Sequence, residues 1–414
     1  MQRHHQGIGR GDLARSRALW AEAEPLLREH GEWLALAELQ CFRARDLARD
    51  GEVERARATI AEAALWLARA DAPASAPARR DCLASEGVVE RVSGHAARGV
   101  TLLESAVAME RQAGRAEQGT FVELLNVLAR TYFDAARYRD AVQAARQAAA
   151  LIARLGLDHT SHAATARVLQ ALALREGGRP LEALPLQAPV AGATSRLSER
   201  IQYAATLLQL ARLDGLVATL DELLVVSRSV NPSAQRDVRL LQVRTLTDLG
   251  RWQEAAAPLA DAEALFAPLR ATQHYAWHRL LLARVHWALA SGDASRAQGA
   301  LDEARVVVQA AGQGDDPAWH KIHQLQARVH LASGRATEAL KAIDDALDWS
   351  LRLAVDPDGS LQVADDRLLR ARAQRLLGHV EAAHADAALA ERHARAAGGD
   401  DHPLVRLAHE ELLH

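Results

Sequence analysis

The sequence predicts an all-α protein, a right-handed α-solenoid of about nine stacked helical hairpins. Apolar residues make up 49% of the 414 residues but aromatic residues only 4%, and most of the others are Ala, Leu and Val. Such a composition favours close packing between helices. In addition, a turn motif recurs about every 42 residues, and the apolar residues between the turns recur at helical spacing.

The recurrent turn follows an apolar helix and precedes a second helix that carries an alanine near its start. Gly51 and Gly94 lie 43 residues apart, and Gly292 and Gly334 lie 42 apart. Glycine at the turn supplies the left-handed backbone conformation that a tight connection between antiparallel helices needs. The complete set of turns is Gly51, Gly94, Ala136, Gly178, Gly250, Gly292, Gly334 and Gly378, with a degenerate turn around Gly215.

Each repeat is predicted to be a pair of helices followed by a polar linker. The clearest pair spans residues 121–156, and both of its helices have an apolar stripe. The first stripe consists of Leu124, Leu125, Leu128, Tyr132 and Phe133, and the second of Tyr138, Ala141, Val142, Ala145 and Ala148. The linkers are rich in Gly, Asp, Asn and Pro, which are signals for the end of one helix and the start of the next.

The repeats predict the organisation of the chain. We expect a partial first repeat at 1–35, N-terminal repeats at 36–213, a degenerate repeat at 214–235, C-terminal repeats at 236–399 and a capping helix at 400–414. No helix of normal length precedes Gly11, so we expect that an upstream part is missing; the alternative is a degenerate first repeat. The apolar stripe around Leu19 and Trp20 predicts end-to-end self-association or fraying at this end.

These turns and small residues resemble the tetratricopeptide repeat. The residues that carry the resemblance are Ala129, Ala136, Tyr138, Ala141 and Ala148, then Gly250, Trp252, Ala255 and Ala262, and finally Gly334, Ala339 and Ala346. The period is nearer 42 residues than the 34 of the basic repeat. It is similar to the longer variants in kinesin light chains and in arrays associated with bacterial kinases and regulators. The resemblance implies a platform for protein interaction.

Charge and composition exclude several classes of partner. The chain has 50 Lys and Arg against 53 Asp and Glu, a net charge of −3, so we expect no nucleic-acid partner. No stretch of about 18 uninterrupted apolar residues occurs, so we expect no membrane contact by this chain. We expect a cytoplasmic protein, or a periplasmic one if an upstream membrane span was removed. Cys41 and Cys82 match no zinc spacing, and we expect both to be small core residues.

The sequence carries no catalytic motif, so we expect no enzyme activity, no cofactor and no metal site. The pairs His274/His278 and His320/His323 could each share a helix face but lack a recognisable third ligand. Carboxylate pairs occur near linker ends, where we expect helix capping and the helix dipole to explain them. They are Asp315/Asp316, Asp365/Asp366 and Asp400/Asp401.

A row of arginines is the main candidate for partner binding. Each arginine comes directly after the small residue in the first helix of its pair. That helix is expected to line the concave wall. The row consists of Arg45, Arg130, Arg244, Arg328 and Arg372, with Arg284 joining if its helix is two residues longer. Guanidinium groups bind carboxylates and phosphates with two hydrogen bonds. Alternatively, the arginines form ion-pair ladders with acidic residues near the starts of the same helices, namely Glu38, Asp81, Glu123, Asp237 and Asp365.

A second candidate surface combines tryptophan with basic residues. Trp277 and Trp287 flank Arg284, and with Lys321 and Arg328 they form the predicted contact patch. Trp and Arg are favoured at the energetic centres of interfaces. The alternative for both tryptophans is packing in the core.

We therefore expect a docking or sensor array that recognises an acidic or helical segment of a partner protein in its concave groove. By analogy with similar arrays, it would be the C-terminal regulatory region of a larger bacterial signalling protein such as a Ser/Thr kinase. The first alternative is the ligand-sensing domain of a large bacterial transcription activator. The second is a structural or secretion adaptor.

Overall fold

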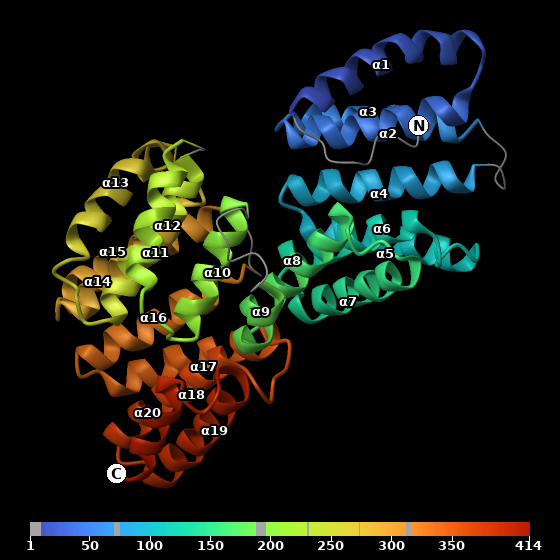
Figure 1. Cartoon of the computed structure of the whole chain (residues 1–414). Helices are drawn as coiled ribbons and strands as arrows, with labels where there is room; N and C mark the ends of the chain where they lie inside the picture. The colour runs from blue at the N-terminus through green and yellow to red at the C-terminus, as the bar shows by residue number, and fades with distance from the viewer. Residues whose placement is uncertain (1–9, 70–74, 188–195, 230–231, 273, 312–315) are drawn as a thin grey trace. The chain divides into compact units, whose positions relative to one another are not determined.

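The computed structural model describes residues 10–69, 75–187, 196–229, 232–272, 274–311 and 316–414. These residues form twenty α-helices, and none of them lies in a β-strand. The chain divides into two compact units, residues 1–170 and 171–414 (Figure 1). The all-α prediction is confirmed, whereas the repeat pattern did not predict this division.

The first unit is built from consecutive helices that pack on their neighbours. The last of them, α8, begins in this unit and ends in the second. The helices are α1 (Arg10–Glu29), α2 (Trp33–Arg49), α3 (Val53–Leu67), α4 (Ala76–Val92), α5 (Ala96–Gln112), α6 (Gly119–Asp134), α7 (Tyr138–Leu155) and α8 (Ser161–Glu176).

The second unit continues the same alternation and ends in a single helix, α20, which packs on α18 and α19. Its remaining helices are α9 (Pro180–Gln187), α10 (Leu197–Gln209), α11 (Leu216–Ser227), α12 (Pro232–Asp248), α13 (Ala256–Ala271) and α14 (Trp277–Ala290). They continue with α15 (Ala294–Ala310), α16 (Ala318–Ala332), α17 (Ala336–Leu353), α18 (Leu361–Leu376), α19 (Val380–Gly398) and α20 (Pro403–Leu412).

The predicted turns lie between successive helices and have left-handed backbone. Gly51, Gly215 and Gly334 all have positive φ, and Ala136 adopts φ of 57° where the motif lacks glycine. At Gly334 the amide donates to the Leu331 carbonyl, and the next amide donates to the carbonyl of His330. These two bonds close the end of α16 and reverse the chain.

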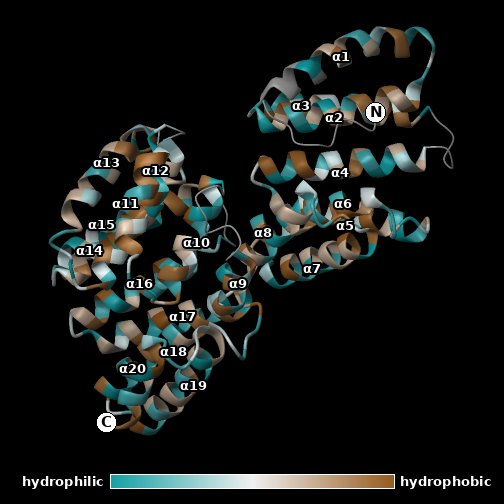
Figure 2. Ribbon diagram, viewed as in Figure 1, coloured by the Kyte–Doolittle hydropathy of each residue, from teal (hydrophilic) through white to brown (hydrophobic). Residues whose placement is uncertain are grey.

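Small residues allow the paired helices to approach closely. Ala129 in α6 and Ala141 in α7 are both fully buried. Ala327 in α16 and Ala339 in α17 are at most 1% exposed. Figure 2 shows hydrophobic and hydrophilic residues interspersed along the helices. This is expected for amphipathic helices that bury one stripe each.

The expectation for the two cysteines needs correction. Cys41 in α2 and Cys82 in α4 are buried, but they are joined in a disulfide with their Cα atoms 5.1 Å apart. The two positions are 41 residues apart, close to one repeat period, so stacking of the two first helices brings them side by side. The disulfide therefore ties consecutive repeats of the first unit together.

No helix in the described ranges combines the length and apolar character needed to cross a membrane.

Candidate ligand-binding groove

The second unit contains a groove of about 680 Å³ along its inner wall. The first helix of each successive pair contributes to it, from the end of α8 through α10, α12, α14, α16 and α18, and α20 covers one side. The repeat therefore places the same face of several helices around one space. Its charged lining residues are Arg175, Glu176, Asp237, Arg244, Asp248, Arg279, Lys321, Arg328 and Asp365.

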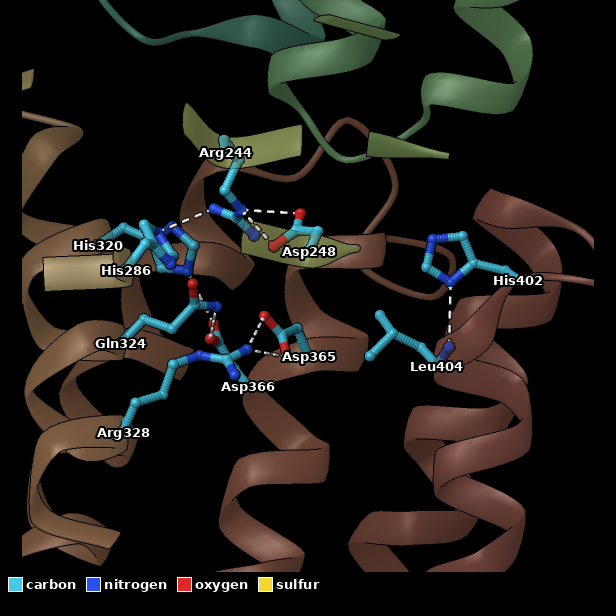
Figure 3. Close-up of polar contacts among 10 residues, drawn as sticks. All are labelled: Arg244, Asp248, His286, His320, Gln324, Arg328, Asp365, Asp366, His402 and Leu404. Carbon is cyan, nitrogen blue, oxygen red and sulfur yellow. Dashed lines mark hydrogen bonds and ion pairs between the residues drawn. The ribbon is translucent and has the colours of Figure 1, made fainter. Parts of the chain in front are cut away.

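Arg244 of α12 connects two neighbouring helices. Its guanidinium donates to Asp248 one turn later at 2.8 Å and lies 2.9 Å from Nε2 of His286 on α14 (Figure 3). Burial, together with the positive charges of Arg244, Arg328 and Lys321, holds the pKa of His286 well below its ordinary value. His286 is therefore neutral near pH 7, and its Nε2 accepts the arginine hydrogen bond.

Arg328 of α16 forms an ion pair with α18 in the groove. One of its guanidinium nitrogens lies 2.6 and 2.7 Å from the two oxygens of Asp365 on α18. Burial acts to raise the pKa of Asp365, but the charge of Arg328 and its hydrogen bonds outweigh this effect and lower it. The pair is therefore charged, and each partner neutralises the other.

A buried polar cluster adjoins the groove, whose lining includes Gln324 of this cluster. His320 Nε2 lies 2.9 Å from Asp366, and the Gln324 amide donates to the same carboxylate at 2.6 Å. The side chains of His320 and Asp366 are 1% and 0% exposed. Asp365 and Asp366 lie inside α18, whose N-cap is Ser360, so the expectation that this pair caps a helix is wrong.

Lys321 stands out among the cations of the groove. The other four are paired with carboxylates, namely Arg175 with Glu176, Arg244 with Asp248, Arg279 with Asp237 and Arg328 with Asp365. Within the described part of the chain, Lys321 has neither a hydrogen bond nor an ion pair. Burial lowers its pKa, although the carboxylates of Asp366 and Asp365 act in the opposite direction. It is one of only two lysines in the chain.

An apolar surface completes the groove. Its residues come from α10 and α12 and, far along the chain, from the start of α18 and from α20. They are Ile201, Leu208, Leu240, Leu241, Leu361, Leu404 and Leu407. The groove therefore offers both a cation and leucine-rich surface to a ligand.

The structure brings together three of the nine predicted partner-binding residues, Arg244, Lys321 and Arg328. The others lie elsewhere in their units. Arg45 faces Glu123 at 3.3 Å in a cavity of about 130 Å³ in the first unit. Arg130 pairs with Asp134 one turn later, and Arg372 donates to Glu411 of α20.

All five arginines of the predicted row are ion-paired, but only two of them have partners that the alternative interpretation names. Arg45 and Arg328 pair with two of the predicted carboxylates, Glu123 and Asp365. Arg244 and Arg130 pair instead within their own helices.

Arg284 does not join the row. The residue six positions before the turn in α14 is His286, and this residue contacts Arg244. Two positions along a helix correspond to a rotation of about 200°, so Arg284 points away and pairs with Glu263 of α13 at 2.8 Å.

The two tryptophans are packing residues in the structure. Trp277 is 3% exposed and packs with Phe266, and its indole donates to Glu303. Trp287 donates to the carbonyl of Trp252 and packs against the same core cluster. The predicted contact patch is therefore divided, because Lys321 and Arg328 line the groove whereas both tryptophans pack in a hydrophobic cluster.

Sequence reasoning missed several groove residues. Arg175 and Arg279 lie at other positions of their helices, and His402 reaches the groove from the linker before α20. His402 Nε2 donates to the Gln209 carbonyl at 3.1 Å, and its Nδ1 accepts the amide of Leu404. The repeat register could have identified His286. No local pattern indicates the contact of His402 with Gln209, because these residues are 193 positions apart.

The fold defined by these stacked pairs and left-handed turns is that of the tetratricopeptide repeat, as the sequence resemblance predicted. The apo form of the quorum sensor NprR from B. thuringiensis has a similar structure, with a TM-score of 0.57 at 14% identity over 82% of this chain and 99% of that one. A tetratricopeptide repeat protein from Parabacteroides merdae matches 72% of this chain and 100% of its own, with 14% identity and a TM-score of 0.41. No protein-family model and no curated protein sequence matches the chain.

Proposed function

We propose that the chain is a recognition module whose second unit binds a segment of a partner protein or peptide in its groove. The bound segment carries an acidic group and apolar side chains. The groove spans several repeats, so that one extended or helical segment can contact several helices at once. NprR, which shares the fold, is a quorum sensor, and this favours a sensing role for the groove.

The observation that carries this proposal is the unpaired Lys321. The four arginines that surround it are neutralised within the molecule, so Lys321 is the group that gains an ion pair when an anionic ligand enters. An ammonium that is partly buried binds a carboxylate more strongly than an exposed one, because water screens the contact less. The leucines of α10 and α20 then remain available for apolar side chains.

Selection of peptides on the intact chain tests the proposal. A displayed library of random dodecapeptides is selected on wild-type protein, and the enriched peptides are measured against Lys321→Met and Lys341→Met. The second variant removes the other lysine, which is exposed on α17, and serves as the matched control.

Enriched peptides should combine Asp or Glu with apolar residues. A hydrogen bond to a charged group contributes about 1.5–3 kcal/mol, so Lys321→Met should weaken binding roughly tenfold to a hundredfold. Lys341→Met should leave the affinity unchanged. Equal binding to all three proteins, or the absence of enriched peptides, would contradict the proposal.

We also propose a place for this module in a larger bacterial signalling protein, either as the regulatory region of a Ser/Thr kinase or as the ligand-sensing domain of a transcription activator. The similarity of the fold to that of the quorum sensor NprR favours the second alternative. The full-length gene distinguishes them: an adjoining kinase catalytic motif supports the first, and an adjoining nucleotide-binding or DNA-binding domain supports the second.

A further inference from the structure

The second unit closes on itself. The turn between α8 and α9, residues 176–179, lies against the segment 355–362, which leads from α17 into α18. The amide of Val355 donates to the carbonyl of Gly177 at 3.0 Å, and the amide of Leu361 donates to the carbonyl of Gly178 at 2.9 Å. These backbone bonds join residues about 180 positions apart in one chain.

Side chains reinforce the contact from both directions. Arg179 donates to the carbonyl of Gly359 at 2.9 Å and lies 3.4 Å from Asp356. The Gln362 amide donates to the carbonyl of Glu176 at 2.8 Å. The neighbouring helix α9 packs against α19 on the same side. Hydrogen bonds and one ion pair thus hold the contact, and Gly177, Gly178 and Ser360 are buried within it.

Two glycines make this approach possible, for different reasons. A Cβ on Gly177 would lie 2.4 Å from the Val355 side chain, and a Cβ on Gly178 would lie 2.0 Å from the Ser360 hydroxyl. Gly178 also has φ of +84°, so its turn needs glycine in any case. Gly177 has no positive φ, so the close approach of Val355 is what excludes a side chain there.

Both sides of the contact line the groove. Glu176 and Gly178 belong to its lining on one side, and Leu361 and Gln362 on the other. His402, bound to the Gln209 carbonyl, joins α20 to α10 across the same space. The ends of the unit therefore meet at the groove.

We propose that this contact, residues 176–179 against 355–362, is a latch whose opening admits ligand to the groove. The role in ligand entry rests on the proposed function, but opening of the latch can be measured without a ligand. The backbone hydrogen bonds of the contact join a turn to the segment that precedes α18, and such local units can open separately from the rest of a fold.

Gly177→Ala in the full chain tests the latch. The backbone at this position accepts alanine, so the substitution acts by pushing Val355 away. The matched control is Gly299→Ala in α15, where a Cβ would meet no atom within 4 Å. Circular dichroism establishes that both variants keep their helices. Arg179→Ala, which removes the bond to Gly359, is a second variant with an effect in the same direction.

The first measurement is hydrogen exchange at the amides of Val355 and Leu361. It should become about tenfold faster in Gly177→Ala and stay unchanged in Gly299→Ala. Unchanged exchange in both Gly177→Ala and Arg179→Ala would show that the contact does not hold the unit closed.

The second measurement follows access to the groove through Lys321. An N-hydroxysuccinimide ester of biotin, a bulky amine reagent, modifies Lys321 and the exposed Lys341, and mass spectrometry measures the ratio of the two rates. The ratio should rise several-fold in Gly177→Ala relative to wild type and Gly299→Ala. Faster exchange at Val355 with an unchanged ratio would overturn the role of the latch in entry. Failure of peptide selection would contradict the proposed function without altering either measurement.

Discussion

At the scale of single residues, four of the five cations that line the groove are paired with carboxylates. Arg328 and Asp365 are both partly buried, with side chains 32% and 23% exposed. By contrast, the pair of Arg130 with Asp134 lies within one helix, and its arginine is 49% exposed. The same residue type at the same repeat position therefore contributes differently to stability, according to its surroundings.

This contrast predicts the effect of two alanine substitutions. Arg328→Ala leaves Asp365 without its partner and should lower the free energy of unfolding by about 1–3 kcal/mol. Arg130→Ala removes an exposed pair within one helix and should cost only about 0.3–0.5 kcal/mol. Urea unfolding measures both. Equal small losses would mean that Arg328 is free to bind ligand and that the pairing with Asp365 contributes little.

At the scale of elements, the repeat template predicts where the helices end, but it predicts only some of the residues that line the groove. The turns at Gly51 to Gly378 could be predicted because a left-handed residue must follow each first helix. Arg244 and Arg328 line the same groove because they occupy the same register position of their helices, and Lys321 lies seven residues before Arg328 on α16. Arg284 was misplaced because the template was shifted by two residues to include it, whereas the unshifted register selects His286.

The disulfide between α2 and α4 was missed for a related reason. The spacing of Cys41 and Cys82 matches no metal site, but it is close to the repeat period that stacks the two helices. Apart from this register, nothing in the sequence brings the two residues together, since they lie in different hairpins.

The disulfide predicts a response to reductant. Closing the loop between α2 and α4 should stabilise the folded protein by about 2–4 kcal/mol, and dithiothreitol should remove this contribution. The double variant Cys41→Ala/Cys82→Ala should be insensitive to dithiothreitol. Two titratable thiols in denatured, unreduced protein would contradict the bond. Disulfides persist mainly in oxidising compartments, so oxidised protein isolated from cells would favour the periplasmic alternative.

At the scale of the whole molecule, the two units should differ in their response to acid. Burial lowers the pKa of six histidines, all in the second unit: His278, His286, His323, His330, His393 and His402. In the first unit, burial instead raises the pKa of Glu38 and Asp81. The division itself could not be predicted from the repeats, because the same template continues through residues 170 and 171.

These shifts predict that the second unit loses stability first as the pH falls. A histidine whose pKa is lowered by folding binds its proton more readily in the unfolded chain, so stability decreases as the pH falls below about 6.5. For Glu38 and Asp81 the sign is opposite, because folding favours their protonated forms. A loss of about 1 kcal/mol corresponds to roughly 2–4 °C in Tm for a unit of this size.

Hydrogen exchange of the full chain at pH 5 and pH 7, corrected for the intrinsic rates, measures this difference. Peptides from residues 171–414 should lose protection at pH 5, while those from residues 1–170 should not. Equal loss in both units would contradict the assignment of the acid response to the buried histidines.

A footprint of the Lys321 side chain tests whether an anionic ligand group occupies the groove there, as proposed. A peptide selected on the wild-type protein is added at saturation, and modification of Lys321 by the biotin ester is compared with that of Lys341. Lys321 should become at least about tenfold less reactive, while Lys341 should react as before. A saturating peptide that leaves Lys321 as reactive as in the free protein would show that the ligand binds elsewhere.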